Sequence, residues 1–457
     1  MDFSIIDRNG VSYKMTDTPL GEGSQGTTYV LEGGKYIAKL FKKNVNDTEL
    51  KSKINFLINL NLDKQIYSVP LQEITVPCSG YISEFASGMM SLSKLKDAGE
   101  DFGDWYVSTG GLLKRYGVLI KLANAIRSLH SKGLVYCDLS PNNVFVSQNP
   151  QQQNVFLIDL DNLRYKTSIV KNIYTPFYGA PEVVKNIAPN TFQSDCYSFA
   201  VIAYELLTFK HPLIGDIVDE DADLEEDALR GDLPWVEDTN DNKNICIETG
   251  LPSEYFVSGK VMKLFHKTFE EGLNNADRRP SMGEWVDALS EGLNDLLMCE
   301  ECKIHYPYSN AHKCPMCGQE PQLVMSLKIQ RWEENEYYDK PSNSVEKNFS
   351  LLPIVYDEIF IDKKTSKYLK AYHFLSSAED YDLPIAQLTV TAVDDDDEMV
   401  KLTIKPLNRY TIFAKIPSLN VEQSFETEKN FRLNILSHKE MIIGVKDFSN
   451  PQRVLVI

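Results

Sequence analysis

Long apolar runs, basic side chains and cysteines are all scarce in this sequence of 457 residues. The most apolar run, at 198–207, has about half the length of a membrane helix and contains Glu205, so we expect no membrane span. The N-terminal segment lacks the basic and apolar regions of a secretory signal. Eight cysteines are too few for a disulfide framework, so we expect a soluble protein of the reducing cytoplasm. The net charge of −18, from 47 Lys and Arg against 65 Asp and Glu, argues against nucleic-acid and anionic-membrane partners.

What the sequence does contain is an ordinary globular composition, with 43% hydrophobic and 25% charged residues. At about 150 residues per domain, the length predicts about three domains. Residues 1–84 have the pattern of short strands joined by Gly-rich turns, and helical periodicity dominates from about 112 to 298. Residues 299–321 form a small cysteine-rich island, and from 322 to 457 the pattern becomes strand-like. These patterns predict an α+β body, a metal island and an all-β C-terminal module.

The first candidate for chemistry is the Gly-rich segment GEGSQG, followed thirteen residues later by a lysine. Gly21, Gly23 and Gly26 would let the backbone approach phosphate groups without a Cβ in the way. Lys39 lies in the strand-like segment YIAKLF, where its ammonium can neutralise phosphate oxygens. Each feature alone has an ordinary alternative, a simple hairpin for the glycines and an edge charge for the lysine.

Two further segments carry carboxylate and amide side chains in a suggestive order. In VYCDLSPNNVFV, Asp138 and Asn143 follow a predicted helix, and in FLIDLDN, Asp159 ends an apolar strand. A carboxylate can orient and deprotonate an attacking hydroxyl, and hard oxygen ligands can hold Mg²⁺. Taken singly, each of these residues also fits a turn or a helix cap.

Together, in this order and spacing, these segments resemble the protein-kinase fold, and the resemblance extends from about Gly21 to Leu297. YGAPEVV at 178–184 is similar to the end of a kinase activation segment. The segment after it resembles the next helix, with Asp195 bracing the catalytic loop, and Arg279 would pair with Glu182. Small-molecule kinases of related fold usually lack these features. The resemblance implies a two-lobed fold, with an N-lobe at 1–84 and a C-lobe at 85–298.

The resemblance also implies a role for each candidate residue. Asp138 would position the acceptor hydroxyl, Asn143 and Asp159 would hold Mg²⁺, and Lys39 would bind the α- and β-phosphates of ATP. The glycines would cover the phosphates, and the segment from Glu84 to Ala86 would present backbone groups to adenine. Glu49 is the predicted partner that clamps Lys39. It follows Lys39 by only ten residues, and an exposed helix charge is the alternative interpretation.

Four positions depart from the kinase pattern. The usual His-Arg before the catalytic aspartate is Tyr136-Cys137, and the Arg is the residue that receives a phosphorylated activation segment. We therefore expect activity that does not depend on phosphorylation of that segment. Ser140 replaces a lysine near the transferred group, and Asp161 replaces the glycine that ends the metal-binding triplet. The triplet Asp-Phe-Gly at 101–103 precedes the catalytic loop, so we predict that it is only a loop.

Four cysteines in two pairs predict a metal site. Cys299-x-x-Cys302 and Cys314-x-x-Cys317 have the spacing of two knuckles that can place four thiolates around Zn²⁺. The alternatives are two disulfides or four unconnected thiols. The spacing resembles a zinc ribbon, and four filled positions predict a structural metal.

Two acidic segments have less specific interpretations. Residues 216–241 carry twelve acidic side chains against Arg230. A solvated loop is one interpretation, and a docking surface for a basic protein partner is the other. In the tail, strand-like segments at 386–393 and 400–407 are separated by Asp394–Glu398, which we predict to be a solvated turn. The tail itself is predicted to serve partner recognition.

The sequence thus predicts an ATP- and Mg²⁺-dependent Ser/Thr protein kinase of bacterial type, with a structural Zn²⁺ ribbon. The resemblance suggests a stress-signalling set in which a metal-dependent phosphatase and a von Willebrand A-type protein are partners. A nucleotide-binding scaffold without catalysis, a pseudokinase that presents the tail, is the first alternative, favoured by Ser140 and Cys137. A small-molecule kinase is the second.

Overall fold

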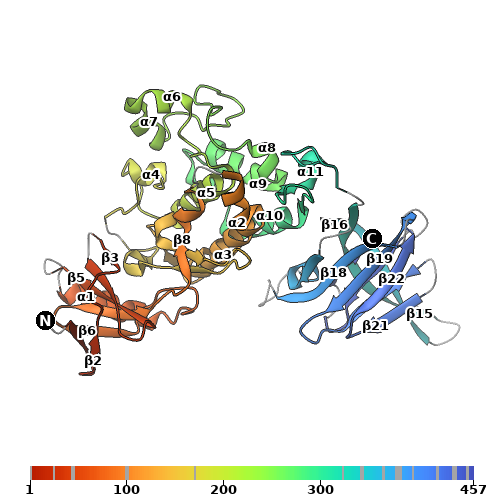
Figure 1. Cartoon of the computed structure of the whole chain (residues 1–457), viewed down its shortest axis with the longest axis horizontal. Coiled ribbons are helices and arrows are strands. Elements are labelled where there is room, and N and C mark those ends of the chain that lie inside the picture. Colours follow the sequence, from red (N-terminus) through yellow and green to blue (C-terminus); the bar gives the residue numbers. More distant parts are fainter. Residues whose placement is uncertain are drawn as a thin grey trace. The chain divides into compact units, whose positions relative to one another are not determined.

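The computed structural model describes residues 3–457 except 24–25, 43–46, 98–101, 169–170, 322–323, 340–343, 363–365, 376–382, 394–395, 418–420, 435–439 and 449–451. The chain divides into two compact units, which are described separately (Figure 1). The first consists of Met1–Ser253 and Val261–Leu289, and the second of Glu254–Lys260 and Ser290–Ile457.

The first unit begins with a seven-stranded antiparallel sheet in the order β2-β1-β6-β7-β5-β4-β3. Its strands are β1 (Ser4–Asp7), β2 (Ser12–Lys14), β3 (Gly21–Glu22), β4 (Gly26–Val30), β5 (Tyr36–Phe41), β6 (Gln72–Val76) and β7 (Gly80–Glu84). The helix α1 (Asp47–Asn59) packs Leu50 and Ile54 against Phe41 and Tyr81 of the sheet. This packing gives the sheet a second hydrophobic layer.

The rest of the first unit is mainly helical. Its helices are α2 (Phe102–Ser108), α3 (Gly111–Ser131), α4 (Pro181–Val184), α5 (Phe192–Thr208), α6 (Asp216–Glu220), α7 (Glu225–Leu229), α9 (Gly259–His266, shared with the second unit), a π-helical turn (Lys267–Glu271) and the start of α10 (Met282–Asp295). Its short strands are β8 (Met89–Ser91), β9 (Leu134–Val135), β10 (Val144–Ser147), β11 (Val155–Leu157) and β12 (Arg164–Tyr165). The short 3₁₀ turns are Leu92–Leu95, Pro141–Asn143, Leu160–Asn162, Ala222–Leu224 and Ala276–Arg278.

Helices α3 and α5 form the buried centre of this helical part. Nearly every residue of α5 from Ser194 to Thr208 is buried, which explains why its sequence is apolar around most of the helix. Its N-terminus has a reciprocal cap between Thr191 and Ser194. In the part of the chain that the structure describes, no helix is both long and apolar enough to cross a membrane.

Two sequence interpretations of this unit need correction. The triplet at 101–103 was predicted to be a loop, yet Phe102 and Gly103 begin α2, where Phe102 stacks on Tyr106. Asp101 lies outside the described residues. Of the two interpretations of the acidic segment 216–241, the solvated loop needs correction, because the segment contains α6 and α7. Val218 and Ala228 anchor these helices, because both side chains are buried.

The second unit contains α8 (Ser253–Phe256), the end of α10, β13 (Leu296–Met298), β14 (His305–Pro307) and α11 (Tyr308–Ala311), followed by strands. A six-stranded sheet has the order β16-β15-β24-β23-β20-β21, and a four-stranded sheet has the order β17-β18-β19-β22. The strands are β15 (Val324–Asp339), β16 (Ser344–Asp362), β17 (Ser366–Lys370), β18 (Pro384–Val393), β19 (Asp396–Pro406), β20 (Ile412–Ile416), β21 (Val421–Phe425), β22 (Lys429–Asn434), β23 (Ile442–Val445) and β24 (Gln452–Val456), with one 3₁₀ turn at Ala371–His373.

The two sheets share one hydrophobic core. Leu327 and Ile443 of the larger sheet belong to the same buried cluster as Leu388 and Leu402 of the smaller one. This arrangement is that of two sheets packed face to face. The predicted turn at Asp394–Glu398 is shorter than expected, because β19 already begins at Asp396 and pairs it with Val393; residues 394–395 lie outside the described residues.

Candidate functional site

The site is built around Lys39, which β5 carries into the space beside two carboxylates. Its Nζ lies 2.6 Å from Oδ1 of Asp159 and also pairs with Oδ2 of Asp161. Burial alone would lower the pKa of Lys39, but the charges of Asp161 and Asp159 outweigh that effect and raise it. Lys39 therefore stays charged, and with two carboxylates it leaves an excess negative charge that suits a cation.

The backbone around Asp159 explains why both carboxylates reach one ammonium group. Asp159 has a left-handed conformation with φ 55° and ψ 52°, and a 3₁₀ turn over Leu160–Asn162 follows at once. Leu160 is buried between the two acids. Tyr136, which stands at the position of the usual histidine, donates its hydroxyl to Ile158 O at 2.5 Å and holds the strand end before Asp159.

Asp138 is held from two sides by residues distant in the sequence. Oδ1 accepts a hydrogen bond of 2.6 Å from Thr175 Oγ1, and Oδ2 accepts one of 3.3 Å from Asn162 Nδ2. Asn143 donates its Nδ2 to Asp138 O at 2.9 Å, which leaves its amide oxygen for another partner. Ile158 N donates to Asn143 O, so Asn143, directly before β10, lies beside the end of β11, after which Asp159 follows.

This donor set fits Mg²⁺. The carboxylate of Asp159 and the amide oxygen of Asn143 are hard oxygen ligands, and the Asp159 side chain is 33% exposed and thus open to a bound group. Asp138, Asn143, Asp159 and Lys39 are brought together in the way that the sequence pattern implies.

The three glycines differ in what constrains them. A Cβ on Gly26 would lie 2.3 Å from Leu40 O, so the close approach of β4 to β5 requires a glycine there. Among the described residues, a Cβ on Gly21 would meet no atom within 4 Å, and one on Gly23 would meet Gly26 O at an ordinary contact distance of 3.9 Å. Gly23 N donates to Gly26 O across the hairpin. Gly21 and Gly23 can therefore face a ligand, whereas packing within the sheet requires Gly26.

The structure does not bring Glu49 to Lys39. Glu49 is exposed on α1, and among the described residues the ion pairs of Lys39 are those with Asp159 and Asp161. The side chain of α1 that turns towards the site is Lys53, whose Nζ donates to Leu163 O at 2.6 Å. Burial lowers the pKa of Lys53, and the charge of Asp161 opposes that effect.

The predicted adenine segment follows β7. Ser83 is fully buried and its hydroxyl bonds to that of Ser68, while Glu84 and Ala86 are half-buried. Phe85 N donates to Lys35 O, and Met89 N donates to Ala86 O, which fixes the turn. The segment thus connects the seven-stranded sheet with β8 in a defined conformation.

The activation-like segment is held by buried side chains. Arg164 Nη2 donates to Asn190 Oδ1 at 2.6 Å, and Asn190 donates to Ile173 O and to Cys137 O. Asp195 accepts backbone hydrogen bonds from Tyr136 and Cys137, as the sequence pattern implies. These contacts connect Arg164, Ile173 and Asn190 to one another and to the catalytic loop at Cys137.

The predicted pair of Arg279 and Glu182 is present as a two-pronged ion pair. Arg279 Nη1 and Nη2 lie 2.8 and 2.7 Å from the two carboxylate oxygens of Glu182. The Arg279 side chain is fully buried. This pair joins α4 to the segment before α10.

In the second unit, the four cysteines lie together. Their Sγ atoms are all within 4.8 Å of one another, and Cys299–Cys317 and Cys302–Cys314 are 3.4 and 3.5 Å apart. A disulfide needs about 2.05 Å, and none of the eight cysteines, all of which lie among the described residues, forms a disulfide. In a tetrahedral site with Zn–S bonds of about 2.3 Å, neighbouring sulfurs are about 3.8 Å apart, so the cluster fits Zn²⁺.

Each cysteine pair is shaped by a left-handed residue directly after it. Lys303 has φ 60° and Gly318 has φ 74°. Lys303 N donates to Cys299 O, and Gly318 N donates to Cys314 O. The two turns therefore have the same construction, as expected for paired metal-binding knuckles.

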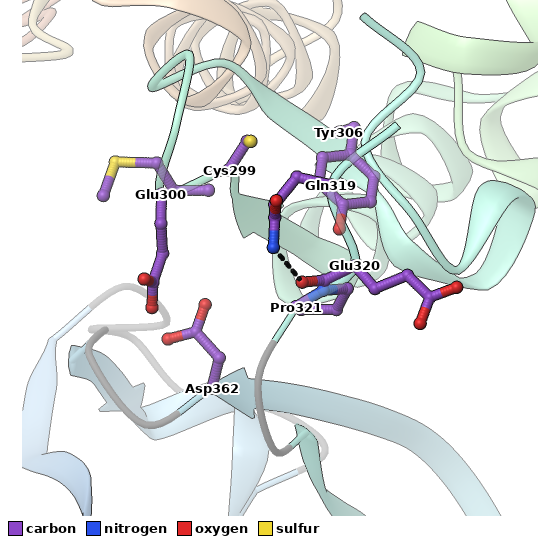
Figure 2. Close-up of a pocket in the computed structure, with 8 residues that line it drawn as sticks. Cys299, Glu300, Tyr306, Gln319, Glu320, Pro321 and Asp362 are labelled. Carbon is purple, nitrogen blue, oxygen red and sulfur yellow. Dashed lines mark hydrogen bonds between the residues drawn. The ribbon is translucent and has the colours of Figure 1, made fainter. Parts of the chain in front are cut away.

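A small pocket adjoins this cluster (Figure 2). It is lined by Cys299 and Tyr306 and by the acidic side chains of Glu300, Glu320 and Asp362. Gln319 donates its Nε2 to Glu320 O, the interaction drawn in Figure 2. The lining thus places three carboxylates beside the cysteine cluster.

Three contacts at the site were not foreseen from the sequence. They are the ion pair of Asp161 with Lys39 and the hydrogen bonds of Asn162 and Thr175 to Asp138. Asp161 and Asn162 are polar and lie within three residues of the predicted metal ligand Asp159. This position is the feature of the sequence that could have indicated their contacts at the site. For Thr175, the sequence offered only its position in the segment before Glu182 as an indication of its contact with Asp138.

Comparison with known proteins identifies the domain. Residues 95–288 match the protein kinase domain family, so the matched part includes Asp138, Asn143 and Asp159 but not Lys39. The chain therefore contains a protein kinase domain.

Curated relatives are similar over parts of the chain. The serine/threonine-protein kinase RUNKEL of Arabidopsis thaliana is 33% identical over 105 residues, 22% of this chain and 7% of that protein. The serine/threonine-protein kinase PknD of Protochlamydia amoebophila is 26% identical over 233 residues, 44% of this chain and 23% of that protein. Protein kinase C delta type of Homo sapiens is 33% identical over 125 residues, 26% of this chain and 18% of that protein. The chain thus spans less than a quarter of each of these relatives.

Proposed function

We propose that the chain is an ATP-dependent protein kinase that transfers the γ-phosphoryl group to Ser or Thr hydroxyls. The observation that carries the proposal is the pairing of Lys39 with Asp159 across 120 residues, beside a catalytic-type loop in which Asp138 is oriented by Thr175 and Asn162. The names of the relatives support the same activity, because all three are Ser/Thr kinases or a protein kinase C.

Each residue has a role that its contacts support. Lys39 binds phosphate oxygens, Asp159 and Asn143 hold Mg²⁺, and Asp138 orients the acceptor hydroxyl and accepts its proton. When bound, Mg²⁺ would neutralise the charge that develops on the phosphates. Gly21 and Gly23 leave room for phosphate groups, and the segment from Glu84 to Ala86 offers backbone groups to adenine.

The test is phosphotransfer by the purified full chain with Mg²⁺, γ-labelled ATP and a generic basic protein. Asp138→Asn and Asp159→Asn are the matched variants, and thermal unfolding checks that both remain folded. We expect label on Ser or Thr, identified by mass spectrometry, that both variants lose. An unlabelled wild-type reaction would refute the proposal.

A non-catalytic scaffold that binds nucleotide is the second candidate. Cys137 and Ser140 favour it, because two cationic side chains of the kinase pattern are absent at these positions. The same reaction separates the candidates, since a scaffold would be stabilised thermally by ATP without transferring label.

We also propose that the four cysteines bind one structural Zn²⁺ and form a ribbon ahead of the strand-rich C-terminal module. The acidic surface at 216–241 would dock a basic protein substrate, and the module would recognise a partner. A cytoplasmic location, a stress-signalling role and partners of phosphatase and von Willebrand A type belong to the same proposal. Salt-sensitive substrate binding that is lost on neutralising residues 216–241 would support the docking surface.

A further inference from the structure

In the kinase pattern, a carboxylate on a helix pairs with the phosphate-binding lysine. Among the described contacts, the ion pairs of Lys39 are instead with Asp159 and Asp161. Glu49, the predicted clamp, is exposed on α1. The buried side of α1 carries Leu50, Ile54 and Leu57, and Glu49 points away from this side. A carboxylate from another element must therefore orient Lys39.

We propose that Asp161 is the residue that positions Lys39, in place of a helix glutamate. The inference rests on the proposed function and deepens it. Asp161 pairs with Lys39 through Oδ2, and its side chain is 8% exposed. Asp159 also contacts Lys39, but its side chain is 33% exposed. The two acids therefore differ in how open they are to a ligand.

Because Asp159 and Asp161 differ in exposure, we assign a different role to each carboxylate. Asp159 faces open space and is the expected Mg²⁺ ligand, so its charge is shared between the metal and Lys39 once the site is filled. Asp161 is enclosed, and its charge stays with the lysine. An ion pair in such an enclosed place is geometrically well defined, because few alternative partners compete for it.

A second partner fixes Asp161 from the sheet. Tyr81 lies opposite Lys39 in the pairing of β5 with β7, and the Tyr81 hydroxyl hydrogen-bonds to Asp161. The two donors are thus neighbours on adjacent strands, and both converge on one carboxylate. This arrangement holds the acid at a constant position relative to Lys39.

Helix α1 supplies the complementary charge. Lys53 turns inward and donates to Leu163 O, two residues beyond Asp161. In the predicted scheme the helix would carry the acid that meets Lys39, whereas here the helix carries a base and the segment after Asp159 carries the acid. A link between the helix and the segment after Asp159 thus remains, but it is a hydrogen bond from a lysine to a backbone carbonyl.

The experiment is a double-mutant cycle on the full chain with Asp161→Asn and Lys39→Ala. Two quantities are measured for each variant, kcat/KM for ATP in phosphotransfer and the calorimetric affinity for MgADP, which needs no catalysis. Asp161→Asn should lower kcat/KM at least about tenfold and weaken MgADP binding at least about threefold. In the Lys39→Ala background the same substitution should change either quantity by less than about twofold, because Asp161 acts through Lys39.

Two further variants sharpen the test. Asp161→Glu, which keeps the charge, should recover part of the loss, and Glu49→Gln should match the wild type. The inference is wrong if Asp161→Asn behaves as the wild type, if Glu49→Gln produces the loss, or if the effect persists without Lys39. A wild-type protein that binds MgADP but transfers no phosphate would instead refute the proposed activity, and the binding cycle would still report on Asp161.

Discussion

Thr175 donates a hydrogen bond of 2.6 Å to Oδ1 of Asp138, so the activation-like segment directly contacts the carboxylate expected to receive the acceptor proton. Asn162 Nδ2 donates a hydrogen bond to the other oxygen, Oδ2 of Asp138. The carboxylate thus has both of its oxygens oriented before any substrate is bound. Its geometry depends on where the segment around Thr175 lies.

The first prediction follows from this contact. Thr175→Val removes the donor but keeps the shape of the side chain, so we expect kcat to fall by about tenfold, the rough value of one charge-assisted hydrogen bond. Thr175→Ser should retain most of the activity, since it keeps the hydroxyl. Steady-state phosphotransfer measures both, with Thr167→Val, on an exposed residue of the same segment, as the control. Equal rates for Thr175→Val and the wild type would contradict the role.

The second prediction concerns phosphorylation. Arg164, Asn190 and the backbone of Ile173 already hold the segment in place. We therefore expect that replacing Thr167, Ser168 and Tyr174 by Ala, Ala and Phe leaves the rate within about twofold of the wild type, since Thr167 and Tyr174 are exposed, Ser168 is half-buried, and substitutions near the surface usually have small effects. Thr175 must stay in this test, because its contact with Asp138 gives it a role of its own.

The matched variant for that prediction is Asn190→Ala, which should lower activity because it removes the side chain that joins Arg164, Ile173 and Cys137. Rates of protein phosphorylation are compared after phosphatase treatment of each protein. A large loss in the triple variant alone would show that phosphorylation, and not the buried network, orders the segment.

How much the sequence could predict depended on how local each feature is. Asp138, Asn143 and Asp159 could be grouped as a candidate site because each lies in a short motif whose spacing is set by one turn and two adjacent strands. Glu49 was selected by the same pattern, but whether a helix side chain meets Lys39 depends on the rotation of α1 about its axis. Leu50 and Ile54 set that rotation through packing on Phe41, which spacing along the chain does not encode.

The C-terminal module shows the same limit for strands. The alternation at 386–393 and 400–407 predicted two strands, and these segments lie in β18 and β19, which pair with each other. The sequence could not predict that β24 joins β15 while β22 joins β19, because pairing between distant strands is set by register and by which faces become buried.

The third prediction tests the cysteine cluster. We expect one zinc per chain by atomic emission, and we expect Cys302→Ser or chelation to lower the melting temperature of the second unit, because a closed four-thiolate site contributes to folding. Cys78→Ser, outside the cluster, is the control. Phosphotransfer by the first unit need not change. A protein without bound metal that resists chelator would rule out a structural zinc site.

The fourth prediction concerns the ion pair of Arg279 with Glu182. Arg279→Lys keeps the charge but cannot make both hydrogen bonds, so we expect a loss in the free energy of unfolding of about 2 to 4 kcal/mol, near the range for breaking a buried pair. The neighbouring exposed Arg278→Lys should have an effect below about 0.5 kcal/mol. Denaturant titration compares the two, and equal values would show that the pair adds little.

The fifth prediction uses pH. Partial burial opposes ionisation of Glu270, but hydrogen bonds from Thr239, His266 and Trp235 outweigh that effect and lower its pKa. A carboxylate whose folded pKa is depressed contributes stability above its unfolded pKa, about 4.3, and loses that contribution as the pH falls through the folded value. Glu270→Gln should therefore destabilise the protein at pH 7, and its deficit should shrink as the pH falls below about 4.

The control for this prediction is Glu271→Gln, because Glu271 is the exposed neighbour on the same π-helical turn. Melting temperatures of the wild type and both variants are compared between pH 7 and pH 3. A deficit for Glu270→Gln that stays constant over that range would mean that its hydrogen bonds do not depend on ionisation. The segment that joins Trp235 to the π-helical turn would then be held by packing around Phe269 instead.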